Sequence, residues 1–70
     1  MSADQTPEQV AAGMVRVVSD GGAAHTELTA PGGPTVRLLM HQNPGLTGTE
    51  AGRLRAFLAD VIRSVRGEPK

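Results

Sequence analysis

The sequence contains no cysteine, no tryptophan and no tyrosine, and its single phenylalanine is Phe57. The absence of cysteine excludes disulfide bonds and cysteine-ligated zinc as sources of stability. With one aromatic residue, the core has to be filled by aliphatic side chains. A chain of 70 residues hides only about 60% of its extended surface on folding. We therefore expect one small domain with a marginal core, and self-association as a further source of stability.

The chain also lacks a surplus of charge and a long apolar run. Seven basic residues balance seven acidic ones, which argues against non-specific electrostatic binding to nucleic acid or anionic lipid. No stretch approaches the roughly 18 apolar residues of a membrane span. Residues 1–9 have neither the positive charge nor the apolar run of a secretory signal. The sequence thus predicts a cytoplasmic protein, and its Ala, Gly, Val and Arg content is typical of GC-rich bacterial genomes.

The clearest structural signal is a helix near the C-terminus, within residues 46–66. Thr47 and Glu50 have the spacing of a capping box, in which each side chain binds the other residue's backbone N–H. Gly67 can take the left-handed conformation that ends a helix, and Pro69 prevents continuation. The apolar residues recur at helical spacing and predict a buried stripe of Leu54, Phe57, Leu58, Val61, Ile62 and Val65.

Residues 6–19 allow two interpretations. Thr6, Pro7 and Gln9 resemble a helix start, but Gly13 interrupts the run and three β-branched valines follow it. Asp20-Gly21 is a good hairpin turn signal. We expect a short helical turn at about 7–12 and a strand at about 14–19. The alternative is one continuous helix over residues 7–19, which circular dichroism would detect as a higher helix content.

Two further strands are expected at about 23–29 and 35–41, with Pro31-Gly32-Gly33-Pro34 as the turn between them. An odd number of loop residues is needed for Leu28 to share a face with the apolar residues of the last strand. A loop over 31–35 places Leu28 opposite Leu38. The face that the C-terminal helix covers would then hold Val15, Val17, Ala24, Thr26, Leu28, Val36, Leu38 and Met40.

These elements predict an α+β fold: a three-stranded antiparallel meander packed against one C-terminal helix, after a short N-terminal helical turn. The domain covers residues 6–67, with tails at 1–5 and 68–70; the alternative order is α-β-β-α. In outline the first order is similar to the double-stranded-RNA-binding domain, whose last helix begins with a lysine cluster. Here those positions are Thr49, Glu50, Ala51 and Gly52, so the resemblance carries over no binding residue.

Candidate chemical sites are few. The expected register places His25 opposite His41, with Glu27 nearby, which is a conceivable metal ligand set; ordinary surface histidines are the simpler interpretation, and we expect no metal and no cofactor. Ser19, Asp20 and His25 are the residue types of a hydrolytic triad, but they fall within one predicted hairpin that has no pocket around it. The Gly-Gly pairs lack the spacing of phosphate loops. We therefore expect no enzymatic activity.

The function predicted is a small protein-interaction module that forms a homo-oligomer or binds another protein. The expected contact surface is the outer sheet face around Val18 and Leu39, or the exposed edge of a strand, with Met14, Arg16, Val18, Arg37 and Leu39 as contact residues. The alternative is a small nucleic-acid-associated or regulatory protein that uses arginines of the C-terminal helix. The possible phosphate contacts are then Arg55, Arg63 and Arg66.

Overall fold

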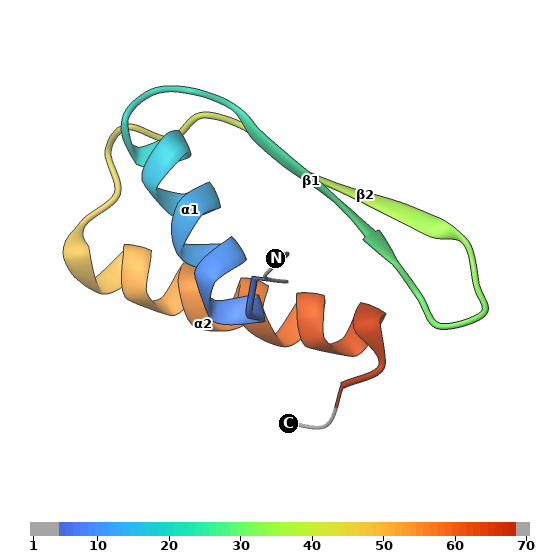
Figure 1. Ribbon diagram of the computed structural model, residues 1–70. Helices are drawn as coiled ribbons and strands as arrows, with labels where there is room; N and C mark the ends of the chain where they lie inside the picture. The colour runs from blue at the N-terminus through green and yellow to red at the C-terminus, as the bar shows by residue number, and fades with distance from the viewer. Residues whose placement is uncertain (1–4, 69–70) are drawn as a thin grey trace.

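The computed structural model describes residues 5–68. The element order is α1 (Pro7–Ser19), β1 (Ala24–Thr29), β2 (Thr35–Met40) and α2 (Gly48–Arg66), with the strands in one antiparallel pair (Figure 1). The α+β class is confirmed, but the predicted three-stranded sheet is wrong, and the alternative order α-β-β-α is the one observed. The predicted tails fall largely outside the described residues, because 1–4 and 69–70 are not described. No helix within residues 5–68 is long and apolar enough to cross a membrane.

The segment predicted as a strand at 14–19 is the second half of α1. Its capping box is complete, since the Thr6 hydroxyl accepts from Gln9 N–H at 3.1 Å and the Gln9 side chain accepts from Thr6 N–H at 2.9 Å. Gly21 has φ +96° and follows the C-cap Asp20, so the Asp-Gly pair ends a helix instead of turning a hairpin. The valines are accommodated because burial of a helical stripe outweighs their lower propensity. That stripe is Ala11, Met14, Val15 and Val18.

The predicted start and end of α2 are confirmed. The Thr47 hydroxyl accepts from Glu50 N–H at 3.1 Å, and the Glu50 carboxylate accepts from Thr47 N–H at 3.0 Å. Gly67 is left-handed, with φ +75°. A Cβ at this position would also lie 3.2 Å from Pro31 Cγ in the hairpin turn, so a glycine suits both the backbone and the packing.

Thr47→Ala should lower the free energy of unfolding by about 1 kcal/mol, because it leaves the Glu50 N–H without its capping acceptor. Urea unfolding followed by circular dichroism measures the change. Thr49→Ala, inside the same first turn but without a capping bond, is the matched control. Equal effects from the two substitutions would contradict the assigned cap.

The hairpin turn occupies Ala30–Pro34. Gly33 N–H donates to Ala30 O at 2.9 Å, with Pro31 and Gly32 (φ +65°) between them, the arrangement of a type II turn. Leu28 therefore lies opposite Val36 and not opposite Leu38 as expected. The loop still holds an odd number of residues, so the predicted apolar face of the two strands is correct.

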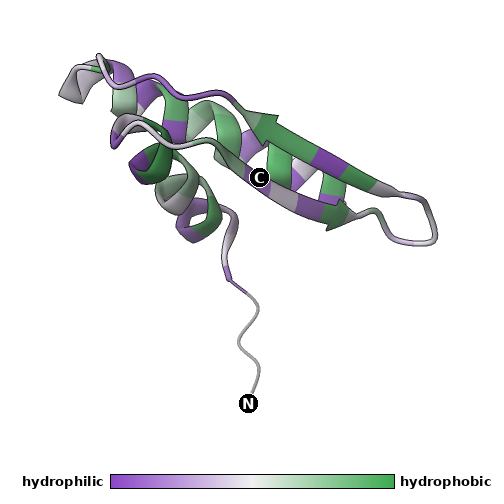
Figure 2. Cartoon of the chain, turned by 90° about the horizontal axis from the view of Figure 1, so that it is seen from above, coloured by the Kyte–Doolittle hydropathy of each residue, from purple (hydrophilic) through white to green (hydrophobic). Residues whose placement is uncertain are grey.

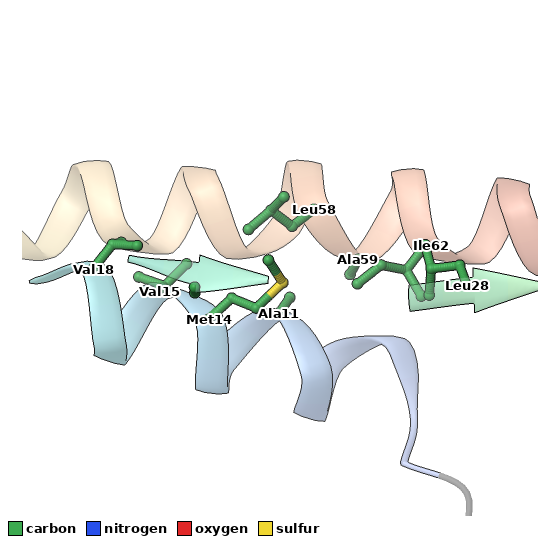
Figure 3. Packing of buried hydrophobic residues seen from close by; sticks show 9 residues of the cluster. Ala11, Met14, Val15, Val18, Leu28, Leu58, Ala59 and Ile62 are labelled. Atoms are coloured by element: carbon green, nitrogen blue, oxygen red, sulfur yellow. The ribbon is translucent and has the colours of Figure 1, made fainter. Parts of the chain in front are cut away.

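The core lies where the two helices and the inner face of β1 meet (Figure 3). Figure 2 shows α2 running beneath the strands with α1 beside β1. Asn43 N–H donates to Val18 O at 3.0 Å and ties the β2–α2 connection to the end of α1. The buried residues of the described part of the chain are all apolar: Pro7 at the start of α1, and the core residues Ala11, Met14, Val15, Val18, Ala24, Leu28, Leu58, Ala59 and Ile62.

Phe57 is not in the core, contrary to expectation, and 64% of it is exposed. The buried stripe of α2 is rotated toward Ala59, because the small side chains on this side allow α1 to approach closely. Leu54 and Val65 still pack against the core. The single aromatic residue is therefore left on the flank of α2 away from α1.

Candidate interaction surface

The outer edge of β2 carries backbone groups that point away from the sheet. Ala30 N–H donates to Pro34 O at 3.3 Å, so Ala30 and Pro34 form a hydrogen-bonded pair of the antiparallel ladder. Such pairs alternate along the ladder, which makes Leu28–Val36, Thr26–Leu38 and Ala24–Met40 the next ones in the observed register. The N–H and C=O groups of Thr35, Arg37 and Leu39 must then face outward.

The helices cover β2 far less than they cover β1, against which both of them pack. On the inner face of β2, Val36 is 39% exposed, and Leu38 and Met40 are only half-buried. On the outer face, Leu39 is 65% exposed. This strand is thus an open, largely apolar edge, which proteins normally cover, charge or bend.

The neighbouring flank of α2 continues this apolar surface. Ala59 and Arg63 line the side of α2 that faces α1. A helix turns about 100° per residue, so Phe57 lies on the opposite flank from Ala59 and away from α1. Because α1 lies beside β1 (Figure 2), this flank is the one nearer β2. Val61, one turn further on, is half-buried. We call the set Val36, Leu38, Met40, Phe57 and Val61 the β2–α2 side.

Charge is absent from the β2–α2 side itself and lies around it. Arg37 is the one charged residue of β2 and belongs to the outer face, where its Nη2 lies 3.2 Å from Glu27 Oε2. Both side chains are more than half exposed, so the ion pair contributes little to stability. It does neutralise the arginine next to the open edge.

The predicted contact residues are only partly brought together. Met14 is 5% and Val18 0% exposed, so both belong to the core and not to a sheet face, and that part of the prediction is corrected. Arg16 is exposed on α1. Arg37 and Leu39 do lie on an exposed sheet face, as expected.

Of the arginines predicted to contact phosphate, Arg55 and Arg63 line one groove between the helices, and Arg66 lies outside it. Arg63 pairs with Glu8 and, at 2.9 Å, with Asp60. Arg66 donates to Gln5 O at 2.8 Å. Arg55 is exposed and lies over a groove of about 450 Å³ between the helices, whose rim also holds Glu8 and Asp60. Two of the three arginines are thus engaged within the chain.

The histidines lie apart in the register. His25 is opposite Leu39, and His41 follows the end of β2, because the turn begins at Ala30 instead of Pro31. Glu27 is engaged by Arg37. Within the described part of the chain, no group of three or more His, Cys, Asp or Glu residues could hold a metal ion.

Sequence reasoning missed the exposure of Phe57, and it named an exposed strand edge as a contact surface without assigning that edge to β2. Phe57 belongs to the apolar stripe of α2. No local signal in the sequence indicates that packing against α1 rotates the buried part of this stripe and leaves Phe57 outside the core. The strand at 35–41 is an edge strand in the predicted meander as well as in the observed hairpin, whereas the second open edge, on β1, follows only once residues 14–19 are helical. In comparisons with known proteins, no family model, no curated protein and no solved structure matches this chain.

Proposed function

We propose that this chain is a small protein-interaction module without enzymatic activity, and that it works as a homodimer. The observation that carries the proposal is the β2–α2 side, an apolar surface that runs from an open strand edge to the only phenylalanine of the chain. Exposed contiguous apolar surface of this kind marks interaction sites in soluble proteins.

The size of the domain supports self-association. Among the described residues only ten are buried, none of them is aromatic, and β2 contributes none. Small domains usually need a supplement such as a disulfide, a metal or oligomerisation, and the sequence excludes the first. A second copy supplies apolar cover for the same residues that the monomer leaves half-exposed.

The measurement that tests the proposal is the solution mass at micromolar to millimolar concentration, by light scattering coupled to size exclusion. We expect a mass of twice 7.3 kDa, falling on dilution. A folded protein that keeps the monomer mass at the highest concentration contradicts the proposal.

Leu39→Pro should weaken dimer formation strongly while leaving the hairpin folded. The Leu39 N–H faces outward, so proline removes no hydrogen bond within the sheet, and proline is tolerated on edge strands in this orientation. We expect the apparent dissociation constant to rise at least about tenfold, the equivalent of about 1.4 kcal/mol. Sedimentation equilibrium measures it, and circular dichroism verifies the fold.

Leu39→Ala is the matched control, because it removes the side chain but keeps the N–H group. Leu38→Pro is the converse control: its N–H bonds to β1, so this substitution should disrupt the hairpin itself. A Leu39→Pro protein that is folded and dimerises as well as the Leu39→Ala protein would show that the β2 edge is not the contact.

A further inference from the structure

We infer that two copies join antiparallel through β2, in a register centred on Leu38, to form one continuous four-stranded sheet with strand order β1-β2-β2-β1. This inference rests on the proposed homodimer and specifies its geometry. It is carried by three observations: the outward peptide groups of β2, the sequence order along that strand, and the position of Phe57 on α2.

The backbone restricts the possible registers. In a two-fold antiparallel pair, residues with outward groups must lie opposite one another so that their N–H and C=O groups exchange hydrogen bonds. On β2 these are Thr35, Arg37 and Leu39. Two positions of the two-fold axis keep most of the strand paired. An axis at Arg37 pairs residues 35–39 of one copy with residues 35–39 of the second copy. An axis at Leu38 pairs residues 36–40 with residues 36–40.

Of these two registers, the one centred on Leu38 is favoured by the placement of charged and apolar residues opposite one another. Centring on Arg37 sets that residue directly opposite its own copy, and like charges opposite each other are destabilising. It also leaves Met40 opposite Pro34 of the second copy. Centring on Leu38 sets Arg37 opposite Leu39 instead, and the two exchange backbone hydrogen bonds.

The inner face of the joined sheet is then apolar across the whole seam. Leu38 lies opposite Leu38 of the second copy, and Val36 lies opposite Met40 on either side of it. These are the three residues that the helices of one copy leave partly uncovered. The seam therefore extends the core of each copy into the other.

This register also covers exposed apolar surface on the outer face of the sheet. Each Leu39, 65% exposed in the monomer, gains the aliphatic stem of Arg37 from the second copy as a neighbour, while the guanidinium stays at Glu27 of its own chain. Apolar surface is covered, and the arginine keeps its ion pair.

The position of Phe57 indicates how the two α2 helices lie relative to each other in the dimer. Each α2 lies beneath the strands, and its flank away from α1 points along the sheet toward the seam. The two-fold axis through Leu38 brings the Phe57 flanks of both α2 helices toward each other under the paired β2 strands. Phe57 and Val61 then line the seam from below.

Hydrogen exchange on the unmodified protein gives the first test. In the dimer, the amides of Arg37 and Leu39 donate across the seam, whereas those of Glu27 and Thr29 face outward from the other edge. We expect the first pair to exchange at least about tenfold more slowly than the second at millimolar concentration, and the difference to vanish on dilution below the dissociation constant. Equal, fast exchange in a dimeric sample overturns the inference.

Single cysteines test the register, because the chain has none of its own. In the Leu38-centred register, Cα atoms of the two residues 38 are about 4.5 Å apart, within disulfide range. Residues 37 are then diagonal neighbours at about 7–8 Å, beyond it. We expect Leu38→Cys to form a covalent dimer with the thiol oxidant diamide, at least about tenfold faster than Arg37→Cys.

The outcomes separate this inference from the proposed function. Faster crosslinking of Arg37→Cys overturns the register while the homodimer stands. A dimer in which neither cysteine crosslinks and the Arg37 and Leu39 amides exchange freely overturns the seam and leaves association through another surface. A monomeric wild-type protein overturns both. Melting of each variant, monitored by circular dichroism, verifies its fold, and the exchange measurement decides the seam if Leu38→Cys does not fold.

Discussion

Ile62→Ala is expected to lower the free energy of unfolding by about 3 kcal/mol, within the range of about 2–5 kcal/mol for truncating a buried Ile or Leu. Ile62 is 0% exposed and lies beside Leu28 at the centre of the helix–sheet contact (Figure 3). The total stability of a chain of this length is only about 3–10 kcal/mol. This single substitution therefore removes a large part of it, and urea unfolding at a fixed protein concentration measures the loss.

Val17→Ala is the matched control for Ile62→Ala. Val17 is β-branched, helical and 43% exposed, so its truncation removes little buried surface and improves helix propensity. We expect a change of less than about 0.5 kcal/mol. Equal losses from the two substitutions would contradict the assignment of the core.

Phe57→Ala is expected to raise the dimer dissociation constant by about 30- to 150-fold with little change in the stability of the monomer. Phe57 is 64% exposed in the monomer, and covering about half of that surface is worth about 1–1.5 kcal/mol in each copy. Because a two-fold interface contains the residue twice, the loss is about 2–3 kcal/mol per dimer. Sedimentation equilibrium of the wild type and the variant measures it.

Arg55→Ala is the matched control for Phe57→Ala. Arg55 is also large, exposed and central in α2, but it lies over the groove toward α1. Its truncation should leave the dissociation constant within about twofold. If Phe57→Ala dimerises as tightly as this control, the α2 flank is not part of the interface.

Local signals in the sequence predicted much of the fold. The Thr47–Glu50 box and Gly67 set the limits of α2, and the Pro-Gly-Gly-Pro turn produced a hairpin whose apolar face was predicted correctly. These features depend on residues close together in the chain, so their physics can be read without the tertiary structure.

The errors arose where tertiary packing decides between two local preferences. Residues 13–19 contain a helix-disfavouring glycine and three valines, yet the apolar spacing of α1 allows it to bury Met14, Val15 and Val18 at once. The one-residue difference in the turn moved His25 away from His41. The predicted contact residues depended on the first of these decisions, which is why only Arg37 and Leu39 among them lie on an exposed sheet face.

The hydrogen bond from Arg66 to Gln5 O has a consequence for how this domain can be used. It brings the entry to α1 and the exit from α2 together, and the salt bridge between Arg63 and Glu8 holds the same region. A chain whose entrance and exit are neighbours can be inserted into a loop of a larger polypeptide, or linked in tandem, with little strain on either host or guest. The junction lies at the start of α1, so a fused neighbour would be attached beside the helices and not within β2.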